Sequence, residues 1–307
     1  MTIRTALMGL ALIAAAGLTT PASAQSCDAK CLHGHLDAYM AALPAHSAAR
    51  LPVAANVKYT ENGKALMLGK GLWEKASGLT PYAHSFVDAV SQQAMFYGIV
   101  KEGAESTIAS IRLGIANGKI AEVEHIVARK GSHALFAPQV LTQPNPMLTT
   151  AVVAAKRSTR IELIAIADSY MEGIQQHSSK IVRAAIDCQR IENGVQTTNQ
   201  PGRGSKNCQH SADLLTYIKS VDERRFPIVD VERGIVFSTF IFDIPGEVSS
   251  ANDASISSNA QLAATLREPR MLLLTEWFKI EGGVITHIEA AMHNLPHGTR
   301  SGWGGSR

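Results

Sequence analysis

An internal repeat constrains the fold of this chain more than any other feature of its sequence. Glu-Asn-Gly occurs at 61–63 and again at 192–194, which is 131 residues later. Upstream, LDAYM at 36–40 and ADSYM at 167–171 share Asp, Tyr and Met at the same spacing. Two separate matches at one spacing, with no gap between them, indicate two copies of one structural unit.

Each copy is expected to begin with helices. Apolar residues at helical spacing predict an amphipathic helix at 28–43 in the first copy and at 159–176 in the second. A shorter helical stretch is expected to follow at 46–56 and at 178–187. The Glu-Asn-Gly segment then makes a turn, because Asn and Gly both tolerate positive φ.

Long strand hairpins are predicted after each of these turns. They reverse direction at Asn117-Gly118, Gly234 and Gly282-Gly283. The closing hairpins match again, as IAEVE at 120–124 and ITHIE at 285–289, now 165 residues apart. The second copy is therefore longer, which we assign to the loop between Cys188 and Cys208 and to the polar stretch 246–261. Helices followed by strands predict an α+β fold.

The chain resembles the nuclear transport factor 2-like superfamily, which includes ketosteroid isomerase and the SnoaL cyclases, and within it the secreted two-domain proteins. The likeness rests on the segments YTENGK, CQRIENG, RRFPIVD, FKIEGGVITHIE and PHGTRSGW. It implies two tandem cone-shaped domains at 25–136 and 159–307, joined by a linker at 137–158. Each would have helices packed on a curved antiparallel sheet, and we expect the cones to pack sheet to sheet. This superfamily contains isomerases, dehydratases, hydrolases and binding domains, so the fold does not fix the reaction.

Residues 1–24 have the pattern of a secretory signal peptide. Arg4 precedes an apolar run at 6–18, and Ala22-Ser23-Ala24 supplies small residues for cleavage after Ala24. The apolar run is too short to span a bilayer, and no other stretch of the sequence is long enough. We therefore expect a periplasmic or secreted protein without a membrane span.

Four cysteines remain after this segment, an even number that favours disulfides in an exported chain. Cys188 and Cys208 would close a loop of about 20 residues. Cys27 and Cys31 are four residues apart and can bridge near the mature N-terminus. A pairing between the N-terminal cysteines and the loop cysteines remains open.

The composition and the motifs exclude several classes of function. The formal net charge is only +3, and no run of Lys and Arg with interleaved aromatics indicates a nucleic-acid partner. No dinucleotide-binding or phosphate-binding glycine motif and no helical pair of histidines is present, so we expect neither a cofactor nor a metal. Outside the cytoplasm this favours proton transfer, elimination or addition of water.

One acidic residue interrupts an apolar stripe. Strand alternation over 272–280 places Glu276 on the same face as Leu274 and Phe278, with Trp277 on the opposite face. Such an acid is either at the sheet edge, in a salt bridge, or buried with a raised pKa suited to general acid–base catalysis. In the next strand His287, Glu289 and His293 share one side. This pattern fits a solvated face and the floor of a polar cavity equally well.

A second candidate group lies on the preceding strand and at its repeat. Arg225 and Asp230 occur in RRFPIVD, and FVD at 86–88 echoes IVD at 228–230. Asp88 is therefore the expected counterpart of Asp230, with His84 nearby. Limonene epoxide hydrolase-like sites use an Asp-Arg-Asp arrangement to activate water, and a structural ion pair is the alternative interpretation.

The C-terminal segment HNLPHGTRSGW is rich in turn residues and follows the last strand. It either closes over a pocket or covers the sheet edge. The candidate substrate-binding residues combine this tail with aromatic and imidazole side chains elsewhere: Tyr59, Trp277, His287, His297, Arg300 and Trp303.

Two function classes follow from these observations. The first is a cofactor-independent enzyme, a hydrolase or lyase acting on a small apolar or aromatic molecule, with hydrolytic aryl-ether cleavage as one specific form. The second is a non-catalytic periplasmic module that binds a small ligand or a partner; homo-oligomers are compatible with either class. We expect the site in the second copy, with Glu276, Asp230, Arg225 and His293 as catalytic candidates. His84 and Asp88 are the alternative catalytic candidates in the first copy.

Overall fold

The computed structural model describes residues 26–200, 205–246 and 267–304. The predicted signal peptide and most of the polar stretch 246–261 lie outside these residues. Among the helices described, none is long and apolar enough to cross a membrane.

The chain forms an α+β structure with two six-stranded sheets. The first sheet has the order β2-β1-β6-β5-β4-β3, and the second has the order β8-β7-β12-β11-β10-β9. The first comprises β1 (Val53–Glu61), β2 (Lys64–Ala65), β3 (Gly78–Asp88), β4 (Gln93–Glu102), β5 (Glu105–Ala116) and β6 (Lys119–Ala128). The second comprises β7 (Ala184–Glu192), β8 (Val195–Gln196), β9 (Ser220–Asp230), β10 (Ile235–Ile244), β11 (Arg270–Glu281) and β12 (Val284–Pro296). In each sheet the four strands of the two long hairpins are antiparallel, and the first strand runs parallel to the last.

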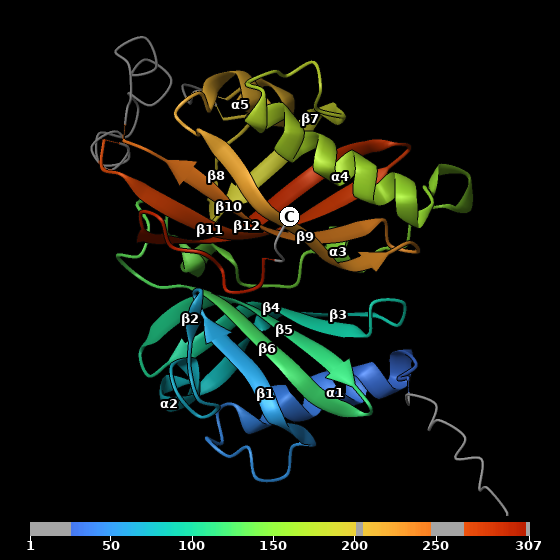
Figure 1. The fold of residues 1–307 in the computed structure, drawn as a ribbon. Coiled ribbons are helices and arrows are strands. Elements are labelled where there is room, and N and C mark those ends of the chain that lie inside the picture. Colours follow the sequence, from blue (N-terminus) through green and yellow to red (C-terminus); the bar gives the residue numbers. More distant parts are fainter. Residues whose placement is uncertain (1–25, 201–204, 247–266, 305–307) are drawn as a thin grey trace, which may run out of the picture.

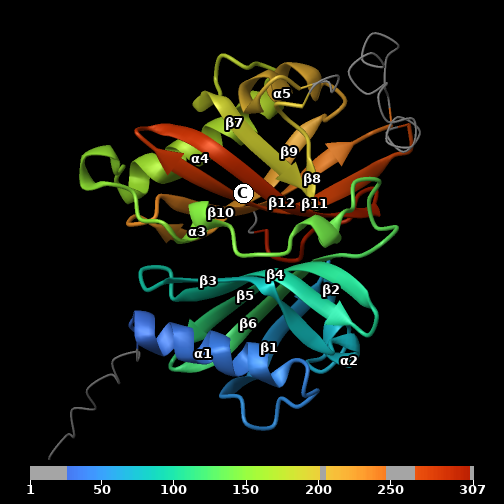
Figure 2. The same ribbon diagram turned by 180° about the vertical axis from the view of Figure 1, so that it is seen from behind.

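The described helices are α1 (Ala29–Ala42), α2 (Leu72–Lys75), α3 (Pro146–Thr149), α4 (Arg160–Gln175) and α5 (Cys208–Leu214), with short 3₁₀ turns at Pro138–Val140 and Ala154–Lys156. All but α3 cover the outer faces of the two sheets, whereas Leu148 of α3 packs between the sheets. Figures 1 and 2 show the two sheets facing each other, with α1 and α2 below one and α4 and α5 above the other. The chain therefore has four layers, and the two sheets form the inner pair, as the sheet-to-sheet prediction expected.

The two long helices begin where the sequence predicts them. The side chain of Asp28 accepts a hydrogen bond from the backbone N–H of Cys31 and caps α1. Thr159 and Glu162 form a reciprocal capping box at the start of α4. The predicted shorter helices at 46–56 and 178–187 are wrong, because these segments make turns and then enter β1 and β7.

Local backbone chemistry explains why those short helices do not form. His46 and His177 each adopt positive φ, 53° and 50°, which ends helical structure at these points. In the first copy Pro52 also disfavours helical geometry at the residue before it. The strand signal downstream then prevails over helix propensity.

The repeated Asn-Gly pairs do more than reverse the chain. Asn62 donates from Nδ2 to Val127 O and accepts from Val127 N, at 3.1 and 2.8 Å. Asn193 makes the equivalent pair of bonds to Met292, at 3.0 and 2.8 Å. Each asparagine thus ties the end of the first strand to the last strand of its sheet, which accounts for the repeat of Glu-Asn-Gly.

Glycine is required beside each of these asparagines. Gly63 and Gly194 have φ of 75° and 82°, where side chains are strained. A Cβ on Gly194 would also lie 2.3 Å from the carbonyl oxygen of Ala137.

Two disulfides join the pairs that the sequence favours, Cys27–Cys31 and Cys188–Cys208. The second closes a separation of 20 residues and attaches β7 to α5. Disulfides are typical of an oxidising environment outside the cytoplasm.

Each domain has its own apolar core between its sheet and its helices, and a third cluster lies between the sheets. This interdomain cluster combines residues of both repeats: Tyr82, Phe86, Met95, Tyr97, Ile99, Ile108, Ala128, Leu141, Leu148, Ile228, Ile235, Phe237, Trp277 and Ala291. Because large aromatic and aliphatic side chains from both sheets are fully buried there, the two domains form one packed body.

Candidate functional site

Glu276 lies in the interior of the second domain, on the face of β11 that packs under α4. Leu274 and Phe278 belong to the same apolar core, as strand alternation predicts. Glu276 is only 1% exposed, and its Oε2 has no hydrogen-bond partner among the residues that the structure describes. Burial raises its pKa to about 8; the charge of Glu192 adds to the rise, and that of Arg190 opposes it. Glu276 is therefore largely protonated at neutral pH.

A tyrosine and an arginine complete the polar part of this interior. Arg190 on β7 donates from Nη1 to the hydroxyl of Tyr170 on α4, at 2.7 Å. Its Nε donates to Thr197 Oγ1 at 2.9 Å and lies 3.4 Å from Glu192 Oε2. Because Arg190 has only donors, the Tyr170 oxygen must accept, and the Tyr170 hydroxyl keeps its own proton for donation. The sequence interpretation did not identify Arg190 or Tyr170 as site residues.

The first domain contains a related centre built around His125, which is fully buried on β6. Trp73 Nε1 donates to the hydroxyl of Tyr39 at 2.7 Å, and that hydroxyl lies 2.8 Å from His125 Nε2. On the other side of the ring, the hydroxyl of Tyr59 lies 3.3 Å from His125 Nδ1. Burial lowers the pKa of His125 to about 4, so the imidazole is neutral.

The remaining polar atoms of this first centre are also bonded. The Tyr59 hydroxyl lies 3.0 Å from Lys70 O and 3.4 Å from Glu61 Oε2. Glu61 also accepts from Leu72 N at 2.6 Å and from Arg129 Nη1 at 2.8 Å. The first centre is a closed hydrogen-bond network, in which each ring nitrogen of His125 has a partner.

The repeat relates the two centres residue by residue. Tyr39 corresponds to Tyr170 and Glu61 to Glu192, whereas Tyr59 is replaced by Arg190. The counterpart of His125 on the last strand is Ala290, which cannot titrate. The titratable group of the second centre is Glu276, which pairs with Ala290 from the neighbouring strand β11. In the part of the chain that the structure describes, the polar groups of the first centre are bonded to one another, whereas the second leaves a buried carboxyl oxygen without a partner. The second domain therefore holds the stronger candidate site.

His125 was missed because the sequence interpretation considered only the other face of its strand. On that face the first copy has Glu122 and Glu124 where the second has His287 and Glu289. Alternation in IAEVEHIVA places His125 with Val123 and Val127 on the face toward the helices. That pattern, an imidazole on an apolar stripe, is the same signal that singled out Glu276.

The row of polar residues on β12 faces the other domain. Glu289 is fully buried and accepts from the Tyr82 hydroxyl of the first domain, which lies 2.7 Å from both carboxylate oxygens. Burial raises the pKa of Glu289 to about 7, and the bond from Tyr82 opposes this rise. His287 stacks on Trp277, with ring centroids 5.0 Å apart. His287 and Glu289 are therefore buried and do not form a solvated face.

The candidate residues His84 and His293 also lie between the domains. His84 Nε2 accepts from the backbone N–H of Asn145 in the linker at 3.0 Å, and its Nδ1 lies 3.3 Å from Tyr97 O. His293 pairs with Leu273 on β11, and burial lowers the pKa of both histidines. The pair is therefore separated from Glu276 by the thickness of the second sheet.

Asp88 connects the two domains. Its Oδ2 accepts from Arg160 Nη2 at 2.7 Å and from the backbone N–H of Val229 at 3.0 Å. Burial disfavours its ionised form, but these bonds hold the pKa of Asp88 below its ordinary value. Its counterpart Asp230 accepts from Arg233 N and Nε, at 2.8 and 2.6 Å. Both aspartates thus close turns between strands.

Arg225 also forms an interdomain ion pair. Its guanidinium makes two bonds to the carboxylate of Glu124 on β6, at 2.9 and 2.7 Å. Arg112 donates to the same carboxylate at 2.8 Å. Burial opposes ionisation of Glu124, and the two arginines outweigh it and lower its pKa. The Asp-Arg-Asp arrangement is therefore not assembled with Glu276, and the structure favours the ion-pair interpretation of these residues.

The C-terminal tail crosses back to the first domain. Trp303 Nε1 donates to Thr60 Oγ1 at 2.7 Å, and its ring lies under Lys58 and Arg112, 4.0 and 4.4 Å from the centroid. Arg300 pairs with Glu223 at 2.7 Å. His297 lies 2.9 Å from Asp243 near the surface. The tail thus contacts β1 and β5 of the first domain through Trp303 and β9 of the second through Arg300.

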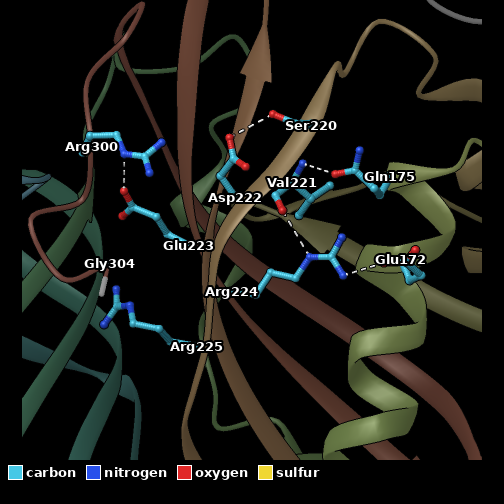
Figure 3. Close-up of a pocket in the computed structure, with 10 residues that line it drawn as sticks. All are labelled: Glu172, Gln175, Ser220, Val221, Asp222, Glu223, Arg224, Arg225, Arg300 and Gly304. Atoms are coloured by element: carbon cyan, nitrogen blue, oxygen red, sulfur yellow. Dashed lines mark hydrogen bonds and ion pairs between the residues drawn. The ribbon is translucent and has the colours of Figure 1, made fainter. Parts of the chain in front are cut away.

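An open cleft of about 940 Å³ lies between β9, α4 and this tail. Figure 3 shows that Arg224 points toward Glu172 on the α4 side, whereas Arg225 and Arg300 lie on the side of the tail. Its charged lining residues form ion pairs with neighbours, including Arg224 with Glu172 at 2.9 Å and Arg300 with Glu223. The cleft lining includes neither Glu276 nor the row on β12.

One group of potential metal ligands lies in the described part of the chain. The single group of potential ligands there comprises Cys27, Cys31 and His35. The two cysteines form a disulfide and offer no thiolate for a metal.

Residues 156–292 match a family model described as a domain of unknown function, DUF8021. No curated protein matches the chain. Among solved structures, "Structure of PrhC from Penicillium brasilianum NBRC 6234" is similar at 14% identity and a TM-score of 0.25, over 44% of this chain and 82% of that chain.

Proposed function

We propose that the second domain is a cofactor-independent general acid–base enzyme, a hydrolase or lyase whose central residue is Glu276. One observation carries this proposal: a fully buried carboxyl on an otherwise apolar strand face, one oxygen of which has no hydrogen-bond partner among the described residues. Burial of such a group lowers the stability of the folded protein unless the group has a hydrogen-bond partner, so its presence suggests a function. Buried acids with strongly raised pKa values are concentrated at sites of proton transfer.

The neighbouring groups suggest distinct roles. Glu276, with a pKa of about 8, can donate a proton near neutral pH and accept it back later in a cycle. The Tyr170 hydroxyl, which accepts from Arg190, can donate a hydrogen bond to an oxygen on which negative charge develops. Arg190 fixes the orientation of Tyr170 and stays charged throughout. Addition of water and elimination both need only this set of proton transfers.

The walls of the interior indicate the class of substrate. Leu274, Phe278 and Phe240 are fully buried in the same core as Glu276. An apolar enclosure with a few polar groups selects small apolar or aromatic molecules. Hydrolytic cleavage of an aryl ether is one reaction of this kind. Glu276 would protonate the ether oxygen as the bond to the phenol breaks, and its carboxylate would then take a proton from the water that adds to the carbon. We further propose that both domains are nuclear transport factor 2-like, and that the protein acts outside the cytoplasm.

The test is turnover of a panel of small aromatic ethers, esters and hydroxy compounds by matched variants. Glu276→Gln should reduce turnover by about 100-fold or more, the usual scale for loss of a general acid or base. Glu289→Gln is the matched control, because it removes a second buried acid of raised pKa from the other face of the same sheet and should leave turnover largely intact. Circular dichroism must show that both variants fold.

Two results would overturn the proposal. Full turnover by a folded Glu276→Gln variant would exclude Glu276 as the acid or base. Tight binding of panel compounds without turnover by the wild-type protein would instead support the alternative, a non-catalytic ligand-binding module.

A further inference from the structure

The layer between the two domains contains a polar pair that the proposed reaction does not use. Trp277 and His287 stack with their planes 20° apart and face the first domain. Trp277 is fully buried, and His287 is 3% exposed. Within the described ranges, neither the indole Nε1 nor either ring nitrogen of His287 has a hydrogen-bond partner.

Three unpaired nitrogens on two stacked residues are unusual in a protein interior. More than nine-tenths of buried polar groups in known structures have a partner in the protein or in ordered water. The first domain shows how the same place is otherwise satisfied. There the repeat has Arg112 in place of Trp277 and Glu122 in place of His287, and these two form an ion pair at 2.7 Å.

The chemistry of the pair defines the partner. A neutral imidazole offers one donor and one acceptor, and the indole offers one donor. Lys279, the cross-strand neighbour of His287, already donates to Thr150 O and Arg233 O at 2.7 and 2.6 Å. Glu289, on the other side, is held by Tyr82. The partner must therefore be able to accept and donate hydrogen bonds and needs no charge.

The packing limits the size of that partner. Tyr97 contacts the edge of Trp277 with centroids 6.4 Å apart, and Phe237 lies 6.2 Å from Tyr97. Rings at these distances are in direct contact, so the side of Trp277 that faces Tyr97 is closed. Because His287 retains slight exposure and Trp277 has none, the approach is from the His287 side.

We propose that the interdomain layer contains an ordered water site, formed by the indole N–H of Trp277 and the ring nitrogens of His287. Water satisfies donors and acceptors together, and buried waters of this kind are integral parts of protein structures. The second domain thus replaces a direct ion pair of the first domain by a hydrated contact. The inference is independent of the proposed function of Glu276.

A high-resolution crystal structure of the wild-type protein tests this proposal directly. The expected result is density for at least one water within hydrogen-bonding distance of Trp277 Nε1 or a His287 ring nitrogen. A dry contact, or density for a molecule larger than water, would overturn it. This measurement decides the question even if variants fail to fold.

His287→Phe provides a second test through the sign of the change in Tm. If the nitrogens are hydrated, the variant loses those bonds, and its Tm should be unchanged or lower. If the layer is dry, removing unpaired polar atoms should raise Tm by about 2–4 °C, which contradicts the proposal. His84→Phe is the matched control: it removes an imidazole from the same layer whose nitrogens both have protein partners, and it should lower Tm.

Discussion

The hydroxyl of Tyr82 in the first domain donates to the carboxyl group of Glu289 in the second, 2.7 Å from each oxygen. The repeat relates this contact to the one between Arg225 and Glu124, in which the second domain supplies the donor. In both cases a glutamate on the last strand of one domain receives a donor from β3 or β9 of the other. The interface therefore has approximate two-fold symmetry with different chemistry on its two sides.

Arg225→Ala should act mainly on stability. The substitution removes the two bonds from Arg225 and leaves Arg112 as the remaining partner of the buried Glu124 carboxylate. We therefore expect a loss of about 1–3 kcal/mol in the free energy of unfolding. Urea denaturation of Arg225→Ala, Glu124→Gln and the double variant measures the coupling between them. Additive effects of the two substitutions would contradict the interdomain ion pair.

Trp303→Ala should loosen the tail from the first domain. The substitution removes the hydrogen bond to Thr60 and the cation–π contacts with Lys58 and Arg112, and we expect a cost of about 1–2 kcal/mol. Trp303→Phe keeps an aromatic face and should have a smaller effect. Limited proteolysis of the tail, together with Tm, checks this prediction; equal protection in all three proteins would contradict it.

The pH dependence of stability should report the buried acid in the second domain. The pKa of Glu276 is about 8 in the folded protein and ordinary in the unfolded chain, so the folded state binds more protons between these values. Its contribution to stability is therefore complete below about pH 4 and is lost as the pH rises through about 8, with a slope of up to about 1.4 kcal/mol per pH unit.

Comparison with Glu276→Gln isolates this contribution from other groups. Glu289 has the same sign, with a pKa of about 7. The pKa of the buried histidines His125 and His287, and of the partly buried His133, is lowered to about 4, and these groups have the opposite effect below their ordinary pKa. The stability difference between wild type and Glu276→Gln should change steadily between pH 5 and 8. A difference that does not vary with pH would show that Glu276 ionises normally.

Local patterns in the sequence were sufficient to predict much of the fold. The repeat and the Asn-Gly turns predicted two copies, and alternation placed Glu276 on the apolar face of β11. Contacts between distant residues could not be predicted in the same way. Arg225 and Glu124 are 101 residues apart and meet only because the two sheets pack face to face. Arg190 was not distinguishable from a surface arginine, since its partner Tyr170 lies 20 residues away on α4.

Titration of the Glu276 carboxyl group tests the central claim most directly, because it needs no substrate. The side-chain carboxyl carbon can be followed by ¹³C NMR against pH, with Glu276→Gln to assign its signal. A midpoint near pH 8 is the predicted result, since burial disfavours the charged form. A midpoint in the ordinary range of exposed glutamates, near 4.3, would show that the carboxyl is solvated or paired and would contradict its role as a buried acid.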